Sequence, residues 1–145
     1  MKKIISTALI FSISIFANSL FAQQITSEQM KAFQSDNIAA FKTVFAKTDY
    51  NKCFATKENS YSPLSLSIKY DNKNIFNYLL SNSADVNKEC DNQTPLMVAA
   101  RYGKADPARS LLTLGANKDT KNKKGETAKD FSIKYKQTAL TEILK

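Results

Sequence analysis

One stretch of the sequence recurs at intervals of roughly 30 to 35 residues, and this periodicity constrains the fold more than any other feature. The clearest copy opens with Thr94-Pro95-Leu96. The preceding copy opens at Ser62-Pro63-Leu64, and the following copy opens at Thr127-Ala128. A fourth, more divergent copy begins at Ser27. A repeat of this length cannot bury its apolar face alone, so the copies are expected to stack.

Each copy predicts two short helices followed by an extended loop. The first residue of each copy is Ser or Thr, whose hydroxyl can accept a hydrogen bond from the free N–H groups at a helix start: Ser27, Ser62, Thr94 and Thr127. Pro63 and Pro95 follow directly, as expected at a first helical position. In the third copy Asp106-Pro107 predicts the start of the second helix, with Asp106 as its cap. Gly115 suits the left-handed residue that ends this helix.

The copies resemble the ankyrin repeat family. The resemblance rests on Thr94-Pro95-Leu96-x-x-Ala99-Ala100-x-x-Gly103 with Leu111-Leu112-x-x-Gly115-Ala116, and Ser62-Pro63-Leu64 with Leu79-Leu80 supports it. It covers residues 25–145 and implies an all-α ankyrin repeat solenoid of four stacked helix-turn-helix units, which start near residues 27, 62, 94 and 127. The first and last units depart most from the pattern and are expected to act as caps. The family's His after Thr-Pro-Leu is absent, since the chain contains no His.

The first 22 residues have the three-part pattern of a secretory signal peptide. Met1-Lys2-Lys3 is positively charged, residues 4–17 are mostly apolar, and Ala22 is a small residue at the expected cut. The apolar run has about 14 residues, fewer than the roughly 20 that span a membrane. We expect cleavage after Ala22, with cleavage after Ser19 as the alternative. Residues 23–145 would then form an ankyrin repeat domain exported to the periplasm, or alternatively to the extracellular space.

Positive charge is concentrated in the C-terminal part of the chain. The full sequence has 21 basic and 13 acidic residues, a net charge of +8. Residues 23–100 hold 8 of each, whereas residues 101–145 hold 11 basic and 5 acidic residues, so the excess there is 11 − 5 = +6. Lys121, Lys123 and Lys124 lie in the third loop. This distribution favours a protein partner with an acidic surface, and a merely solvated lysine-rich face is the alternative. The export signal argues against a nucleic-acid partner.

Two cysteines are available for a structural role. By repeat register Cys53 and Cys90 fall in the loops of the first and second units, which are neighbours in the stack. Exported proteins often pair their cysteines, so a Cys53–Cys90 disulfide is expected, with two free thiols as the alternative. The bond would enclose 36 residues (90 − 53 − 1) and stabilise the fold by about 3–4 kcal/mol.

A cation followed by a tyrosine recurs at one position of three repeats. These pairs are Lys69-Tyr70, Arg101-Tyr102 and Lys134-Tyr135, each one repeat interval from the next. They are expected to form a ladder at the ends of the first helices, beside the concave face. Tyr and Arg are frequent energetic anchors of protein interfaces, so we predict that the ladder binds a partner. Tyrosines packed between neighbouring repeats are the alternative.

Known catalytic patterns are missing from the sequence. It has no His, no glycine-rich phosphate loop and no G-x-S-x-G motif, so we expect no enzyme, no cofactor and no metal site. The leading hypothesis is a periplasmic protein-binding module, monomeric until bound, most concretely an immunity-type protein that sterically neutralises a toxin or effector. The alternatives are a stress-protection factor that supports an antioxidant enzyme such as catalase, and a scaffold at the envelope surface.

Overall fold

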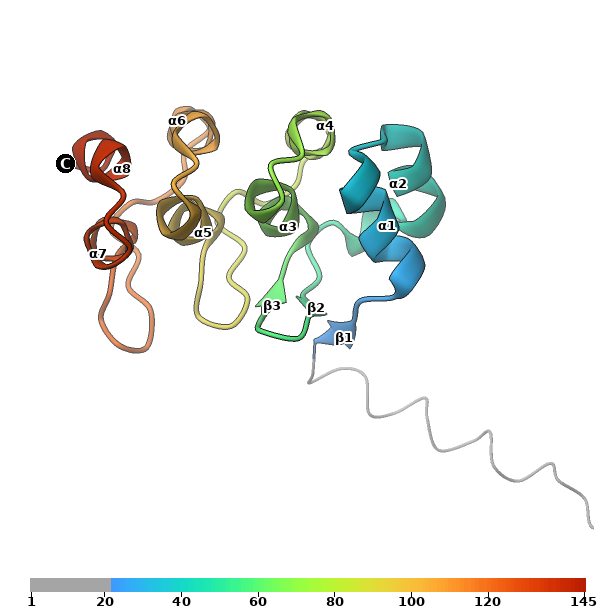
Figure 1. Cartoon of the computed structure of the whole chain (residues 1–145), viewed down its shortest axis with the longest axis horizontal. Helices are drawn as coiled ribbons and strands as arrows, with labels where there is room; N and C mark the ends of the chain where they lie inside the picture. The colour runs from blue at the N-terminus through green and yellow to red at the C-terminus, as the bar shows by residue number, and fades with distance from the viewer. Residues whose placement is uncertain (1–21) are drawn as a thin grey trace, which may run out of the picture.

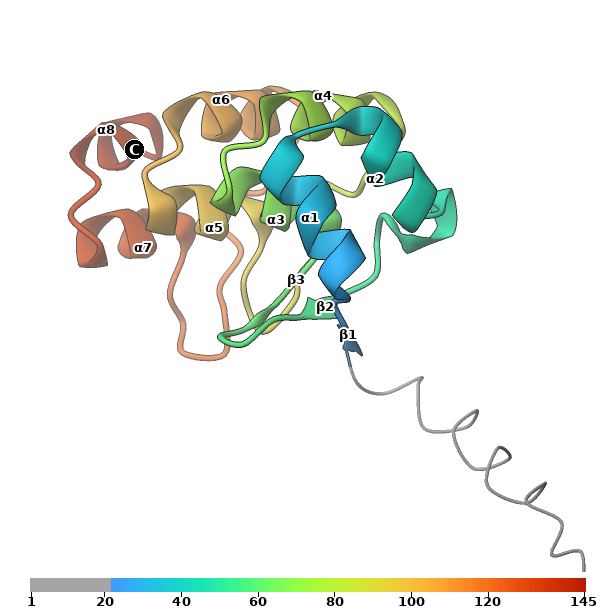
Figure 2. The same ribbon diagram turned by 45° about the vertical axis from the view of Figure 1, so that its right-hand side comes forward.

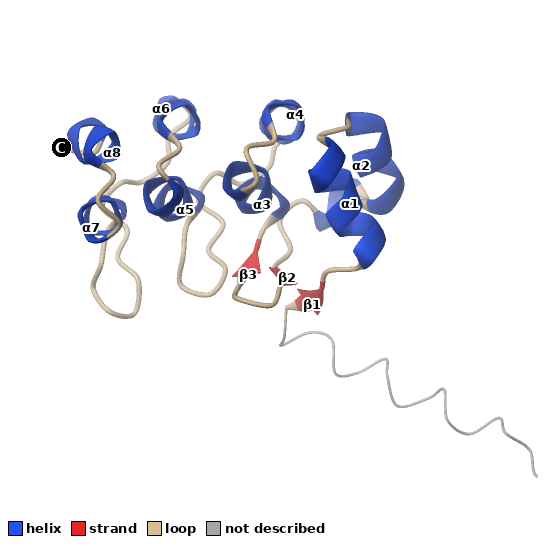
Figure 3. Cartoon of the chain, in the orientation of Figure 1, coloured by secondary structure: helices blue, strands red, loops and turns tan. Residues whose placement is uncertain are grey.

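The computed structural model describes residues 22–145, so that the predicted signal peptide lies, except for Ala22, outside the described residues. Within residues 22–145 the chain forms eight α-helices, arranged as four pairs that stack side by side (Figure 1). In the same range, strands are limited to three two-residue segments near the first loop (Figure 3). This architecture confirms the expected all-α repeat stack. No helix in the described part of the chain is both long and apolar enough to cross a membrane.

Each pair consists of an inner and an outer helix. The inner helices are α1 (Ser27–Ser35), α3 (Pro63–Lys69), α5 (Pro95–Tyr102) and α7 (Ala128–Lys134). The outer helices are α2 (Ile38–Val44), α4 (Lys73–Ser81), α6 (Ala105–Thr113) and α8 (Thr138–Ile143). The loops that connect successive pairs project to one side beneath the inner helices (Figure 1). We call them the first finger (residues 45–62), the second finger (residues 82–94) and the third finger (residues 114–127).

The first finger is longer than the others and carries its own local structure. It contains the 3-10 helix η1 (Lys47–Asp49) and the strands β2 (Phe54–Ala55) and β3 (Ser60–Tyr61), which pair antiparallel. The strand β1 (Gln23–Gln24) pairs with β2 in parallel. Backbone hydrogen bonds from Gln23 to Cys53 and from Ile25 to Ala55, at 3.1 and 3.0 Å, therefore hold the start of the described chain against the first finger.

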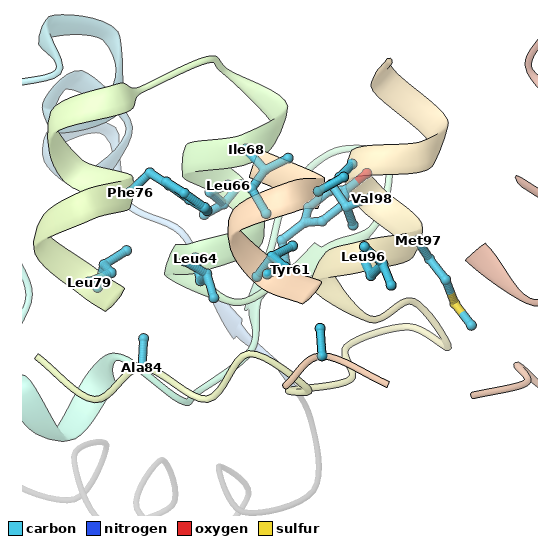
Figure 4. Packing of buried hydrophobic residues seen from close by; sticks show 14 of the residues in the cluster. Tyr61, Leu64, Leu66, Ile68, Phe76, Leu79, Ala84, Leu96, Met97 and Val98 are labelled. Atoms are coloured by element: carbon cyan, nitrogen blue, oxygen red, sulfur yellow. The ribbon is translucent and has the colours of Figure 1, made fainter. Parts of the chain in front are cut away.

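The core runs along the stack, between one unit and the next. Helix α5 packs between α3 and α7, and its Val98, Ala99 and Ala100 are completely buried. The small alanines let the neighbouring backbones approach closely. Leucine, isoleucine and valine side chains of α3 and α5 meet in the space between the second and third units (Figure 4): Leu64, Leu66, Ile68, Leu96 and Val98. Burial of this apolar surface holds the units in register.

The first unit depends on aromatic packing. Phe33, Phe41, Phe45 and Phe54 are buried, and the rings of Phe41 and Phe45 stack with their centroids 4.7 Å apart. The helices of this unit are inclined to those of the other three units (Figures 1 and 2). In this unit large aromatic rings pack against one another, where α5 of the third unit carries small alanines.

Three of the four predicted helix starts are confirmed. The hydroxyls of Ser62, Thr94 and Thr127 accept hydrogen bonds from the backbone N–H three residues later. The prediction for Ser27 is wrong, because the cap of α1 is Thr26. The hydroxyl of Thr26 accepts from the N–H of Gln29, and the side-chain oxygen of Gln29 accepts from the N–H of Thr26 in return, forming a capping box. A threonine followed three residues later by glutamine was the available sequence signal.

The predicted start of α6 is also wrong. The helix begins at Ala105, with Lys104 in the cap position, so Asp106 and Pro107 are its second and third residues. The first-turn N–H groups of a helix have no backbone partner, so Pro107 costs no hydrogen bond there. Asp106 pairs with Arg109 at 3.2 Å instead of capping. Gly115 has the predicted left-handed backbone, with φ of 89°.

Cys53 and Cys90 form the expected disulfide. Their Cα atoms lie 5.7 Å apart, and the bond joins the first finger to the second. A second link supports it, because the N–H of Asp85 donates to the side-chain oxygen of Asn51 at 2.8 Å. The least regular finger is thus fastened to its regular neighbour.

Replacement of Thr26 by Ala should lower the free energy of unfolding by about 1 kcal/mol, because the capping box is lost. Ser27→Ala is the matched control and should change it by less than about 0.5 kcal/mol, since Ser27 is simply the first exposed residue of α1. Urea denaturation followed by circular dichroism measures both. Equal effects of the two substitutions would contradict the assignment of Thr26 as the cap.

The double replacement Cys53→Ser/Cys90→Ser should lower the free energy of unfolding by about 3–4 kcal/mol, because the unfolded chain loses its covalent loop. Urea denaturation checks this, and the wild-type protein in reductant should give the same midpoint as the variant. A loss below about 1 kcal/mol would show that the disulfide does little to fasten the first finger.

Candidate protein-binding surface

The structure brings the three cation–tyrosine pairs into one row. The Lys69 Nζ lies 5.6 Å from the ring centroid of Tyr102, and the Arg101 guanidinium carbon lies 5.2 Å from that of Tyr135. Lys69 and Arg101 thus each contact the tyrosine of the following unit, within the range of a cation–π interaction. We call the six residues of the three pairs the cation–tyrosine ladder: Lys69, Tyr70, Arg101, Tyr102, Lys134 and Tyr135.

The ladder has this geometry because its residues end equivalent helices. Lys69 and Lys134 are the last residues of α3 and α7, and Tyr102 is the last residue of α5. Stacking places these helix ends side by side, one unit apart. Tyr70 and Tyr135 retain 41% and 36% of their accessible surface, whereas Tyr102 is half-buried. The two outer tyrosines of the ladder are therefore exposed, whereas the central Tyr102 is packed between Lys69 and Arg101.

Two carboxylates from the fingers pair with the outermost cations of the ladder. Lys69 contacts Glu58 of the first finger, and Lys134 contacts Glu126 of the third, both at 2.9 Å. The hydrogen bond from Lys69, and then its charge, hold the pKa of Glu58 below its ordinary value. For Glu126, the hydrogen bond from Asn122 lowers the pKa most, followed by the hydrogen bond from Lys134.

Lys69 is more enclosed than Lys134, whose side chain is 50% exposed. The Nζ of Lys69 lies 4.8 Å from the ring centroid of Tyr61, and its side chain is only 11% exposed. Burial alone lowers the pKa of Lys69, but the hydrogen bond to Glu58 and the neighbouring tyrosines outweigh it, so the net shift is upward. The ammonium group stays charged while its aliphatic stem is covered.

Arg101 differs from its two neighbours in the ladder. Its guanidinium carbon lies 5.5 Å from the ring centroid of Tyr102 and 5.2 Å from that of Tyr135. Among residues 22–145, however, no ion pair includes Arg101. The central cation of the ladder is therefore positioned by aromatic rings without being neutralised.

A hollow adjoins the N-terminal end of the ladder. It has a volume of about 570 Å³ and lies between α1, the first finger and the end of α3. Apolar groups of Ile25 and Met30 line it, together with the exposed ring of Tyr70. Lys69 and Glu58 also line it, so the hollow and the ladder form one continuous surface. Another hollow, of about 510 Å³, lies at the turns between inner and outer helices and is lined mainly by polar residues.

The predicted lysines of the third finger are exposed but are not part of the ladder. Lys121, Lys123 and Lys124 all face solvent. The charge of Lys124 contributes to the low pKa of Glu126, the carboxylate paired with Lys134 at the C-terminal end of the ladder. Asp130, in the first turn of α7, has a lowered pKa mainly because it accepts hydrogen bonds from Thr127. The charge of Lys121 adds to this shift. The finger lysines therefore extend the positive charge beyond the ladder.

Comparison with known proteins identifies the repeats. The family model for ankyrin repeats (3 copies) matches residues 29–122. The chain belongs to the ankyrin repeat family. The matched range covers the first three units, and α7 and α8 form a fourth helical pair beyond it. Comparison with curated proteins finds no significant match in sequence.

Membership of the ankyrin family supports a role in protein–protein interaction. Ankyrin repeats bind other proteins and are generally non-enzymatic. Within residues 22–145, no cluster of three or more acidic, Cys or His side chains could hold a metal ion. The ladder offers aromatic surface, ion pairs and hydrogen-bonding groups, which suit recognition of another protein.

Repeat register revealed the ladder but not its carboxylate partners. Glu58 and Lys69 are 11 positions apart in the sequence, whereas Glu126 and Lys134 are 8 positions apart. The fingers differ in length and path, so the two glutamates reach equivalent lysines from different sequence positions. No periodic signal could have identified both.

Replacement of Lys69 by Gln should raise the pKa of Glu58 toward its ordinary value of 4.5, because the hydrogen bond and the charge that lower it are lost. Carbon-13 NMR titration of the glutamate carboxyls measures this, with Lys73→Gln on the exposed side of α4 as the control. A Glu58 pKa that does not respond to Lys69→Gln would contradict the ion pair.

The same ion pair gives stability a defined pH dependence. A carboxyl whose pKa is lowered by folding stabilises the fold above its unfolded pKa. That contribution is lost as pH falls below about 4.5 through the folded pKa. In the Lys69→Gln variant, the free energy of unfolding should therefore fall less as pH drops below about 4.5, because Glu58 has lost the partner that lowers its pKa.

Proposed function

We propose that this ankyrin repeat protein is an exported binding protein of the periplasm that neutralises a toxin or effector by covering its active site. The observation that carries this proposal is the cation–tyrosine ladder, a row of aromatic and cationic side chains held on the stacked inner helices. Such side chains supply most of the binding energy at many protein interfaces. The ladder residues are anchored by their neighbours, so little conformational entropy is lost on binding.

Two observations support export. Residues 1–22 have the charge and hydropathy pattern of a signal peptide. The Cys53–Cys90 disulfide joins two fingers, and disulfides persist mainly in oxidising compartments such as the periplasm. Neither observation depends on the other, and both favour the same destination.

The proposed mechanism is steric and electrostatic. The stacked inner helices and the fingers provide an extended face that can cover a catalytic cleft. The +6 excess of residues 101–145 (11 − 5) would attract an acidic partner surface and speed association. The protein would be a monomer before it binds its partner.

The full chain, produced with residues 1–22 so that the host can process it, should capture a specific protein from an envelope extract of its source organism. If the captured protein is an enzyme, the ankyrin protein should inhibit it at a one-to-one ratio. Replacement of Tyr70 and Tyr135 by Ala should weaken binding at least about 30-fold, as expected for the loss of interface anchors. Leu114→Ala, an exposed apolar residue after α6, should leave affinity unchanged.

Other outcomes would decide against neutralisation. An antioxidant enzyme that is captured and remains fully active would favour the stress-protection alternative. Salt-sensitive pelleting with membranes, without a protein partner, would favour the envelope-surface scaffold. Binding that survives the loss of both tyrosines would move the interface away from the ladder.

A further inference from the structure

We propose that the ladder recognises an extended partner segment with one Asp or Glu, which pairs with Arg101, and one large apolar residue, which enters the hollow beside Tyr70. This inference rests on the proposed function, because it specifies the partner chemistry of the same surface. Lys69 and Lys134 are already paired with glutamates, so Arg101 is the ladder cation left to pair with an acidic residue of the partner.

The third unit lacks, at the position equivalent to Glu126, the carboxylate that pairs with the ladder lysine of the fourth unit. Lys134 pairs with Glu126, eight positions before it. At the same offset before Arg101, the equivalent position holds the neutral residue Gln93. Gln93 is 7% exposed, and its side-chain oxygen has no hydrogen-bond partner within the described part of the protein. The position that supplies a counter-charge in the fourth unit therefore cannot supply one in the third.

The surroundings of Arg101 prepare it for a carboxylate. The ring centroids of Tyr102 and Tyr135 lie 5.5 and 5.2 Å from its guanidinium carbon, which restricts the side chain before binding. A planar guanidinium can donate two parallel hydrogen bonds to a carboxylate. Lys69 is the main cause of the lowered pKa of Glu58, and the charge of Arg101 adds to that shift.

The hollow provides the second anchor. Its lining includes Ile25 and Met30, and the ring of Tyr70 forms part of its wall. Lys69 joins the two sites, because it lines the hollow and its ammonium group also lies 5.6 Å from the ring centroid of Tyr102. Lys31, Lys57 and Glu58 also line the hollow, with Glu58 already paired with Lys69, while Ile25, Met30 and Tyr70 supply its apolar wall. An apolar side chain is therefore the fitting occupant.

The separation of the two anchors sets a spacing on the partner. Packed helices lie about 8–10 Å apart, and the hollow lies one to two units from Arg101 along the stack. That distance, roughly 10–20 Å, corresponds to about three to six residues of an extended chain at about 3.3 Å each. A partner segment of this kind would cross the inner helices along the ladder.

Within the ladder itself, this arrangement fits a peptide-like segment better than a polyanion. Nucleic acids and anionic membranes bind through several free cations at once. In the ladder, Glu58 and Glu126 already neutralise the two flanking lysines. A single free guanidinium beside a hollow with an apolar wall of Ile25, Met30 and Tyr70 instead matches one carboxylate and one apolar group.

A phage-displayed library of random peptides, panned against the oxidised full chain after host processing, tests the proposal. The selected peptides should share one Asp or Glu and one aromatic or large aliphatic residue, about three to six positions apart. Arg101→Gln should weaken their binding by about tenfold or more, and Arg101→Lys should restore part of it. Arg109→Gln is the matched control, because Arg109 is exposed on α6 and paired with Asp106; it should change affinity less than about twofold.

A charge exchange separates recognition from a structural role of Arg101. A peptide whose acid is replaced by Lys should bind Arg101→Glu better than it binds the wild-type protein, which loss of packing could not produce. Circular dichroism melting confirms that the variants fold. Peptides without a shared acid, failure to select any peptide, or equal binding to wild-type protein and Arg101→Gln would overturn the proposal.

The two proposals fail in different ways. A captured inhibitory partner whose affinity is unchanged in Arg101→Gln would refute the carboxylate site and leave the proposed function standing. Peptides with the expected pattern, together with a captured partner that is not inhibited, would refute neutralisation and leave the carboxylate site standing.

Discussion

Burial of apolar surface between neighbouring units is the interaction on which the rest of the structure depends. Val98, Ala99 and Ala100 of α5 are fully buried, and this helix packs between α3 and α7. No single pair of such short helices could bury this stripe by itself. Because stacking fixes the distance between equivalent positions, it also determines the spacing of every surface feature that repeats.

The ladder is a direct consequence of this stacking. A cation and a tyrosine at the end of each inner helix become neighbours of the same residues in the next unit, so Lys69 meets Tyr102 and Arg101 meets Tyr135. The stacked repeats fix the spacing of the ladder residues, while the fingers determine which ladder cations have a carboxylate partner. A carboxylate reaches the first and third cations, and none from the described residues reaches the second.

Periodic features of this protein were predictable from the sequence, whereas local departures were not. The helix starts at Ser62, Thr94 and Thr127 and the ladder follow from register, because equivalent positions in a stack lie close in space. Register placed Cys53 and Cys90 in neighbouring fingers, and the bond between them was expected from export. Register alone misplaced the cap of α1, which lies at Thr26, one residue before the repeat opener Ser27. It also missed the start of α6, where Lys104 holds the cap position without a side-chain hydrogen bond. Glu58 and Glu126 were missed because side chains on fingers of unequal length reach equivalent lysines from different positions.

Specificity in a repeat protein must come from those departures. Identical units would present the same residues at every step, and a uniform row cannot distinguish one partner from another. Here the inclined first unit, held by its aromatic cluster and the disulfide, lies beside a hollow that α1 and the first finger help to form. Gln93 occupies the position where Glu126 neutralises the next cation. The hollow and the unpaired Arg101 break the symmetry of the ladder, and together they give a partner one direction and one register in which to bind.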